Sequence, residues 1–311
     1  MAIESLPKLK TARRSRFVMR WYFWLLLVAV AAYGLAFAMH WDDRGVLWVK
    51  ERFESPAERK ESVWLPDYRA VIDAKLLPGM EKDEASDVSY DPQTKTLFSV
   101  MGKNPFLVEL TLQGDVLRKM PLVGWSNPEG VTVMGNGLLA ITDEREHLLS
   151  IVKVDADTRE LNIANFPKYD LGPSKNQNKG FEAVVWDARR QQLLLGEERP
   201  PALFSWKSDG SQILKGDKQK LSSDALDVRN LSALAIDPRT GHTLVLSADS
   251  HLLLELDEKG EQVSFMTLLG GFNGLKKTIP RAEGVTMDEA GTLYMVSEPN
   301  LFYRFEKQQV R

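Results

Sequence analysis

A short pattern of apolar and polar positions recurs along most of this chain. Each copy opens with a strand-like segment, passes through a polar turn and returns as a second, apolar strand. The clearest copy occupies residues 281–288 and 291–298. Five positions are equivalent in the five copies, namely Ser86, Glu129, Glu182, Ser232 and Glu283. They are separated by 43, 53, 50 and 51 residues, and a period near 50 built from short strands predicts a β-propeller.

The number of copies predicts an all-β, five-bladed β-propeller over residues 64–311. A third strand follows in every copy and a fourth in the first four, where the least clear fourth strand lies somewhere in Gln212–Leu221. The fifth copy ends after three strands, so the early strand at residues 68–74 is predicted to complete that blade and close the ring. A six-bladed ring would need another unit of ~40–50 residues, which the sequence does not contain.

The amino terminus carries a different pattern. Residues 21–39 are uncharged and mostly apolar, close to the ~20 residues that cross a bilayer as a helix. Residues 1–20 have a net charge of +5, which favours a cytoplasmic tail, a single-pass signal anchor and an outward-facing propeller. Residues 40–63 are rich in charge and are predicted to form a stalk. Two alternatives stay open for residues 21–39. One is a cleaved signal peptide, since residues 36–38 resemble a cleavage site, and the other is a buried core helix.

Composition narrows the function further. The chain of 311 residues has no cysteine, which excludes disulfides, thiolate metal sites and a cysteine nucleophile. Its net charge is −3, and the basic tail of residues 1–20 leaves −8 for the rest. An acidic body of this kind disfavours nucleic acid as a partner.

Three glutamates, Glu129, Glu182 and Glu283, open the first strands of predicted blades 2, 3 and 5. In a four-stranded blade the first strand lines the channel, and its start lies on the same face as the end of the second strand. The glutamates are therefore predicted to meet at one mouth of the channel. Further residues that would contact an ion's ligands or a bound molecule there are Ser86, Ser232, Asp143, Glu144, Arg145, Glu198, Arg199 and Glu298.

Such a group of acids needs compensation, because gathered carboxylates repel one another. Hard oxygen ligands favour Ca²⁺ and, to a lesser degree, Mg²⁺. In the alternative interpretation Arg145 and Arg199 form salt bridges with the acids, and the ring is only a structural network. The four histidines show no metal-ligand spacing.

Two long loops, 167–179 and 269–280, are predicted to lie over the same mouth. They are rich in Gly, Lys and Asn, and long irregular loops of this kind are either ligand gates or tolerated insertions.

The segments 143–145, 180–182, 282–284 and especially 296–305 resemble the SdiA-regulated family of bacterial envelope proteins. The resemblance covers roughly residues 66–306. It implies a five-bladed propeller distantly related to NHL-repeat propellers, a calcium site and no established activity. It also implies that Glu129, Glu182 and Glu283 hold the metal, with Ser86 and Ser232 at the two non-acidic positions.

Three functions are consistent with these features. The first is a Ca²⁺-binding module, anchored in the bacterial inner membrane and facing the periplasm, that binds or senses a small molecule or protein at the channel mouth. The second is a metal-dependent hydrolase of lactones or phosphoesters, for which Glu144, Glu198 and His147 are the available bases. The third is a structural scaffold of the envelope.

Overall fold

The structure is a computed structural model. It describes residues 12–38, 45, 48–49, 51–53, 55–172, 180–210, 212–222, 226 and 228–308. The chain divides into two compact units, Met1–Val46 and Leu47–Arg311. Residues 1–11 of the predicted tail, residue 39 of the predicted anchor and residues 173–179 of the first long loop lie outside the described residues.

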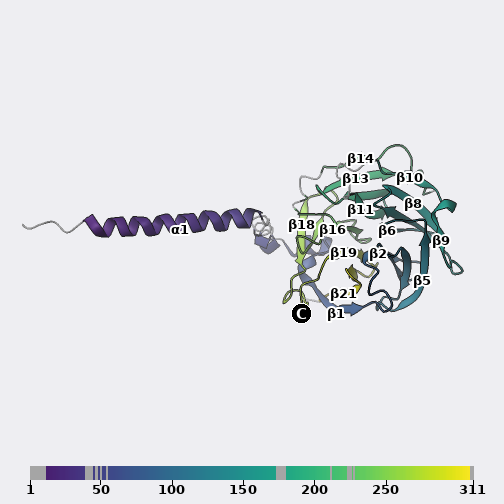
Figure 1. Cartoon of the computed structure of the whole chain (residues 1–311), viewed down its shortest axis with the longest axis horizontal. Coiled ribbons are helices and arrows are strands. Elements are labelled where there is room, and N and C mark those ends of the chain that lie inside the picture. Colours follow the sequence, from purple (N-terminus) through teal and green to yellow (C-terminus); the bar gives the residue numbers. More distant parts are fainter. Residues whose placement is uncertain are drawn as a thin grey trace, which may run out of the picture. The chain divides into compact units, whose positions relative to one another are not determined.

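The first unit contains one long helix, α1 (Ala12–Ala38) (Figure 1). Large apolar side chains are exposed along it, among them Trp21, Phe23, Leu26 and Tyr33. Within the described residues, no helix has the combination of length and hydropathy that a membrane crossing demands.

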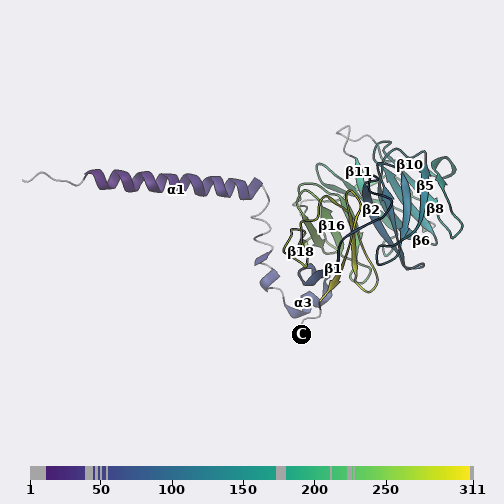
Figure 2. The same ribbon diagram turned by 60° about the horizontal axis from the view of Figure 1, so that its bottom comes forward.

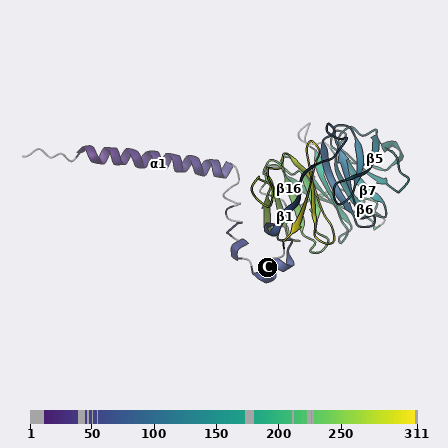
Figure 3. The ribbon, with the colours of Figure 1, turned by 90° about the horizontal axis from the view of Figure 1, so that it is seen from below.

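The second unit is a ring of five sheets, which confirms the predicted five-bladed β-propeller. The strand pairs are antiparallel except where the short strand β9 (Leu161–Asn162) adds in parallel to the outer edge of the first sheet. Figure 1 shows the blades around the channel, and Figures 2 and 3 show them from other sides (Figure 2, Figure 3). Blade 1 is formed by β2 (Ala85–Asp91), β3 (Thr96–Met101), β4 (Phe106–Leu110) and β5 (Val116–Val123). Blade 2 is formed by β6 (Pro128–Gly135), β7 (Leu138–Asp143), β8 (Leu148–Lys153) and β10 (Lys168–Asp170). Blade 3 is formed by β11 (Phe181–Asp187), β12 (Gln192–Glu197), β13 (Ala202–Lys207) and β14 (Gln219–Lys220). Blades 4 and 5 are formed by β15 (Ala233–Ile236), β16 (Thr243–Ser247), β17 (Leu252–Leu256) and β18 (Gln262–Thr267); and β19 (Ala282–Met287), β20 (Leu293–Ser297), β21 (Leu301–Lys307) and β1 (Tyr68–Leu76).

The ring closes through the first strand of the propeller. β1 runs antiparallel to β21, from Tyr68 opposite Lys307 to Leu76 opposite Leu301. The Tyr68 hydroxyl also donates a hydrogen bond to the Gly291 carbonyl at 2.8 Å. Since β1 precedes all the other strands in the chain, blade 5 joins the beginning of the propeller to its end.

The hydrophobic core is divided among the blades. Each of five buried clusters lies between two neighbouring blades, for example Phe98, Leu107, Val131 and Leu139 between blades 1 and 2. The innermost strands are buried on both faces, and β19 has no residue that is even half-exposed. These strands therefore consist of apolar and small residues rather than a strict polar and apolar alternation.

Small residues follow each of the three glutamates because the innermost strands come very close together. A Cβ atom on Gly284 would lie 2.7 Å from the Asp87 Cα, and one on Gly130 would lie 2.4 Å from the Glu182 carbonyl oxygen. The equivalent residue in blade 3 is Ala183. The Glu-Gly sequence thus combines a functional side chain with a steric requirement of the fold.

Two parts of the chain differ from the sequence-based expectation. The first residues of the long loop predicted at 167–179 form β10, the outermost strand of blade 2, which pairs with β8. The second long loop, 269–280, is attached to β1: the Ala70 N–H donates to the Asn273 carbonyl at 2.8 Å, and the Asn273 amide donates to the Tyr68 carbonyl at 2.9 Å. This loop therefore reinforces the seam of the ring.

The segment before β1 is also packed on the propeller, on its blade 4. The N–H groups of Val63 and Trp64 donate to the carboxylate of Glu255 at 2.7 and 3.0 Å, and the Leu65 N–H donates to Ser264 Oγ at 3.0 Å. Val63 and Leu65 are fully buried. Contacts of the propeller unit thus reach the end of the segment predicted as a stalk.

Candidate functional site

The three glutamates lie at the starts of the innermost strands β6, β11 and β19, which surround one mouth of the channel (Figure 1). The three carboxyl groups are close enough for the charge of one to change the pKa of another. Besides burial, which is the largest cause, the negative charges of Glu129 and Glu283 raise the pKa of Glu182. Glu283 likewise raises the pKa of Glu129. The structure therefore brings these side chains, which are distant in the sequence, to one place.

All three carboxyl groups are much weaker acids than an exposed glutamate. Burial raises the pKa of Glu129 to about 8, against a hydrogen bond from Ser86 that lowers it. Burial raises the pKa of Glu283 to about 7, against a hydrogen bond from Ser232 and the charge of Arg281. The pKa of Glu182 lies well above its usual range because of burial and the nearby carboxylates, of which Glu198 has the largest effect. Charging all three together is thus costly without a compensating cation.

The two serines at the non-acidic positions pair with glutamates of the next blade. Ser86 of blade 1 bonds to Glu129 of blade 2, and Ser232 of blade 4 bonds to Glu283 of blade 5. A Cβ atom on Gly102 would lie 2.8 Å from Ser86 Oγ and 3.1 Å from Glu129 Oε1, so the glycine leaves room for the first pair. The five equivalent positions therefore form a ring of three carboxylates and two hydroxyls, which we call the glutamate ring: Ser86, Glu129, Glu182, Ser232 and Glu283.

Arginines offset part of this charge, but only at the edge of the ring. Arg281 Nη1 lies 2.8 Å from Glu298 Oε2, and its Nε lies 3.3 Å from Glu283 Oε1. The Arg281 side chain is 69% exposed, so solvent weakens both pairs. Arg199 pairs with Glu198 at 3.2 Å and also contacts Asp249.

The other predicted arginine, Arg145, is exposed. Within the described residues, neither Arg145 nor the acids Glu129 and Glu182 form a salt bridge. The salt-bridge interpretation therefore accounts for Glu283, Glu298 and Glu198, and leaves Glu129 and Glu182 without an arginine.

Two of the predicted acids support the loops around the mouth. Asp143 is buried, and its carboxylate accepts hydrogen bonds from the N–H groups of Ser126 at 2.6 Å and Glu146 at 3.1 Å. Glu144 accepts from the Asn127 amide and from the Gly180 N–H, both at 3.1 Å, and so links blade 2 to the start of blade 3. Asp143 is a loop-forming residue, whereas Glu144 also acts on the glutamate ring through its charge.

Asp87, immediately below the ring, is a residue that the sequence analysis did not single out. Its carboxylate accepts hydrogen bonds from the N–H groups of Val88 at 2.8 Å and Val131 at 2.9 Å, and another from Val285. It is buried, and burial raises its pKa well above the usual range. The sequence does set Asp87 apart, because the equivalent residues in the other four copies are small and uncharged: Gly130, Ala183, Ala233 and Gly284.

The oxygen atoms of the glutamate ring are of the chemical types that bind a hard divalent cation. Carboxylate and hydroxyl oxygens are the ligands that Ca²⁺ prefers, and Glu129 and Glu182, which have no arginine partner, would gain most from its charge. Over the part of the chain that the structure describes, no three His, Cys, Asp or Glu residues form a ready-made metal cluster. The assignment of Glu129, Glu182 and Glu283 as metal ligands stays a prediction.

Comparison with known proteins identifies the family. The model of the family described as SdiA-regulated matches residues 60–306. The chain belongs to the SdiA-regulated family. This confirms the resemblance carried by the segments around residues 144, 181, 283 and 300.

Solved structures resemble this SdiA-regulated protein only distantly. A chain in the crystal structure of a nidogen/laminin complex is 15% identical, with a TM-score of 0.46 over 68% of this chain and 72% of that one. A streptogramin B lyase is 8% identical, with a TM-score of 0.48 over 78% of this chain and 98% of that one.

Proposed function

We propose that this protein is a binding or sensing module that holds a Ca²⁺ ion at the glutamate ring and presents that mouth of the propeller to a small molecule or protein partner. Membership of the SdiA-regulated family and the propeller fold support a binding or sensing role in general. The calcium site is the more specific part of the proposal. Mg²⁺ is the second choice, because it demands a more rigid octahedron of ligands.

The observation that carries the proposal is the electrostatic state of the ring. Burial and neighbouring carboxylates raise the pKa of all three carboxyl groups, and Glu129 and Glu182 form no salt bridge with any described residue. Such an arrangement costs stability when the groups are charged, and a bound cation removes that cost. Glu129, Glu182 and Glu283 would hold the ion, and the Ser86 and Ser232 hydroxyls would orient two of them. When bound, the ion would supply a positive charge and open coordination positions for an oxygen-bearing ligand.

A metal analysis of the purified full-length chain tests this proposal. We expect about one Ca²⁺ per wild-type chain after dialysis against micromolar calcium, and loss of the ion in Glu283→Gln and Glu182→Gln. Glu160→Gln, at an exposed glutamate outside the ring, is the matched control and should retain the ion. A wild-type chain without bound metal, or equal binding in all four proteins, would refute the calcium site.

We further propose that residues 21–39 anchor the chain in the inner membrane, with residues 1–20 in the cytoplasm and the propeller in the periplasm. The exposed aromatic and aliphatic side chains of α1 and the basic residues ahead of them support this assignment. Fractionation after alkaline extraction tests the anchoring, and carboxyl-terminal fusions to alkaline phosphatase and to green fluorescent protein test the orientation. Recovery of the chain in the soluble fraction, or fluorescence without phosphatase activity, would contradict it.

A further inference from the structure

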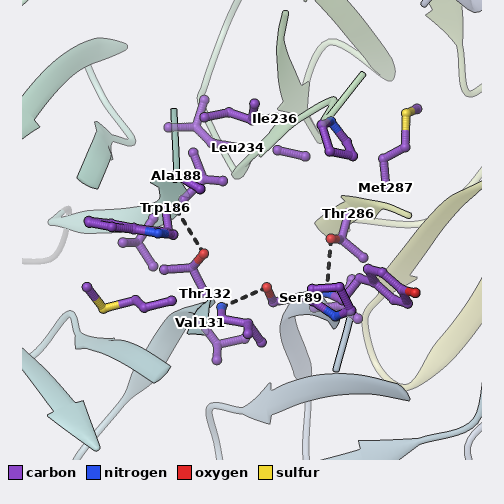
Figure 4. Close-up of a pocket in the computed structure, with 18 of the residues that line it drawn as sticks. Ser89, Val131, Thr132, Trp186, Ala188, Leu234, Ile236, Thr286 and Met287 are labelled. Carbon is purple, nitrogen blue, oxygen red and sulfur yellow. Dashed lines mark hydrogen bonds between the residues drawn. The ribbon is translucent and has the colours of Figure 1, made fainter. Parts of the chain in front are cut away.

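The opposite half of the channel contains a cavity of about 250 Å³ (Figure 4). It is lined by the later residues of all five innermost strands and by the turns that follow them. The glutamate ring lies at the beginnings of the same strands, so this cavity opens towards the other mouth. It is therefore a separate site from the one proposed for Ca²⁺.

The walls of the cavity are mostly apolar. Side chains of Val131, Trp186, Leu234, Val285 and Met287 line it, and Trp186 and Met287 are buried. An engineered apolar cavity of about 150 Å³ binds benzene. A space of about 250 Å³ thus has room for a flat molecule somewhat larger than one ring.

Three hydroxyl groups satisfy backbone donors that point into the channel. The N–H groups of Tyr90, Val133 and Trp186 donate to hydroxyls of the preceding blade at 3.1, 2.9 and 2.9 Å (Figure 4). The acceptors are Thr286, Ser89 and Thr132, respectively. Each acceptor is the third residue after its own member of the glutamate ring, so the arrangement repeats from blade to blade.

The repeat is interrupted at two neighbouring blades. Ile236 and Met287 are equivalent to Tyr90, Val133 and Trp186. The N–H groups of the residues that follow them, Asp237 and Asp288, bond outward to the second strand at 3.0 and 3.1 Å. Because successive N–H groups of a strand point in opposite directions, those of Ile236 and Met287 point into the channel. In the preceding blades, the positions equivalent to the hydroxyl acceptors are occupied by Val185 and Ala235. Their side chains have no oxygen that could accept a hydrogen bond from these two N–H groups.

We propose that this cavity binds a neutral, planar molecule of one or two rings whose carbonyl oxygen accepts hydrogen bonds from the N–H groups of Ile236 and Met287. A buried N–H group without an acceptor is costly, so a carbonyl oxygen at this point gains both hydrogen bonds with little competition. The flat ring system would pack against Trp186 and the aliphatic wall.

Charge at the mouth favours a neutral ligand over an anion. Glu289 lies on the cavity wall and bonds to the Tyr90 hydroxyl, and this hydrogen bond keeps the pKa of Glu289 below its usual range. The nearby Arg239 is already paired with Asp237, with 2.9 Å between Nε and Oδ1. An anionic ligand would therefore meet a net negative wall.

Three probes of similar shape separate these requirements in the full-length chain. Coumarin is neutral and has a carbonyl, naphthalene lacks the carbonyl, and 1-naphthoate carries a negative charge. We expect coumarin to quench tryptophan fluorescence and raise the melting temperature, and the other two to bind at least about tenfold more weakly, the equivalent of one lost hydrogen bond. Trp186→Phe should remove most of the quenching without altering the calcium content.

The decisive variants restore the missing hydroxyls. Ala235→Ser and Val185→Thr supply acceptors to Met287 and Ile236, so each should keep or raise the melting temperature while weakening coumarin by about tenfold. Ala188→Ser is the matched control, because it adds a hydroxyl to the same wall from the turn after β11 rather than from the strand position that supplies the acceptors in the other blades. Every variant is compared at one detergent concentration, so partition of the probe into detergent cancels.

Three results would overturn the proposal. Equal binding of coumarin and naphthalene would mean that the carbonyl is not recognised. If Ala235→Ser binds coumarin as tightly as Ala188→Ser does, the carbonyl oxygen of coumarin does not bind to the N–H group of Met287. Absence of binding by all three probes up to about 1 mM would mean that water alone occupies the cavity. None of these results bears on the calcium site, which Glu283→Gln tests separately.

Discussion

The carboxylate of Asp87 in blade 1 accepts a hydrogen bond from the N–H group of Val131 in blade 2 at 2.9 Å. The same carboxylate accepts from Val285 in blade 5. One buried side chain thus satisfies inward-pointing donors from both neighbouring blades, at the level where the innermost strands come closest. It connects the glutamate ring above it with the cavity below.

Replacing Asp87 with alanine should therefore destabilise the whole propeller. The change leaves at least three N–H groups buried without their acceptor, and we expect a loss of about 3–6 kcal/mol in the free energy of unfolding. Chemical unfolding followed by tryptophan fluorescence measures it. Asp157→Ala, at an exposed aspartate, is the control and should change stability by less than about 0.5 kcal/mol. A loss of that small size for Asp87→Ala would mean that water replaces the carboxylate at no cost.

A second prediction concerns the glycine after the third glutamate. Gly284→Ala places a methyl group 2.7 Å from the Asp87 Cα. This is a backbone atom, which cannot move aside as the end of a flexible side chain could. We expect a loss of about 1–3 kcal/mol in the free energy of unfolding. In blade 3 the equivalent residue is already alanine, so Ala183→Gly should cost only about 1 kcal/mol. A fully stable Gly284→Ala protein would show that the blades can separate without cost.

The sequence predicted the ring of blades because its signal is local and repeated. Glu129, Glu182 and Glu283 occur at equivalent places in copies of one pattern, and the geometry of a blade then decides that they share a mouth. The outer strands were harder to predict. β14 contains only two residues and β10 only three, and strands this short have no period that a sequence can display.

Contacts between distant segments were not predictable from the repeat. Arg281 compensates the charges of Glu298 and Glu283 from the edge of the ring. The equivalent residues in the other four copies of the repeat are not basic. The buried Glu255 bonds to residues 63 and 64, more than 190 positions earlier in the chain. Only the presence of one acid in the apolar strand Leu252–Leu256 hinted that a buried polar partner exists.

A third prediction concerns pH. Glu129 and Glu283 have pKa values raised to about 8 and about 7 in the folded, metal-free chain, above the ordinary glutamate value of about 4.3 that applies after unfolding. The folded state therefore holds protons that the unfolded state has released, and these groups lower stability progressively as the pH rises from about 4.5 to 8. Melting temperatures in a chelator between pH 5 and 8.5 measure this loss.

Calcium should reverse that trend. Protons compete with the ion for the same carboxylates, so affinity for Ca²⁺ should rise with pH up to about 8, and binding at pH 6.5 should release protons. Calorimetry in two buffers of different ionisation enthalpy detects the released protons. In Glu129→Gln with Glu283→Gln the pH-dependent loss of stability should be smaller, and the remaining loss should come from Glu182, whose pKa is also raised. A metal-free wild-type chain that gains stability between pH 5 and 8 would contradict the raised pKa values.

The last prediction concerns Glu255, which fastens the segment before β1 to blade 4. Its carboxylate accepts from the Val63 and Trp64 N–H groups and from Ser264 Oγ at 2.5 Å, and His242 Nδ1 lies 2.7 Å from Oε1. Glu255→Ala should increase hydrogen exchange at the amides of residues 63–65 by at least about tenfold. Limited proteolysis should cut there earlier than in the control Glu261→Ala, whose glutamate is exposed in the turn between β17 and β18.

The pair with His242 makes this attachment depend on pH. The hydrogen bond to Glu255 raises the pKa of His242 above its usual value, so the folded chain binds the imidazole proton more tightly than the unfolded chain does. The stabilisation is complete below about pH 6.5 and is lost as the pH rises through the raised pKa. Protection of the amides of residues 63–65, corrected for intrinsic exchange, should therefore be greater at pH 6 than at pH 8.5, and His242→Phe should abolish this difference. Equal protection at both pH values in the wild-type chain would mean that burial of Val63 and Leu65, rather than the charged pair, holds the segment in place.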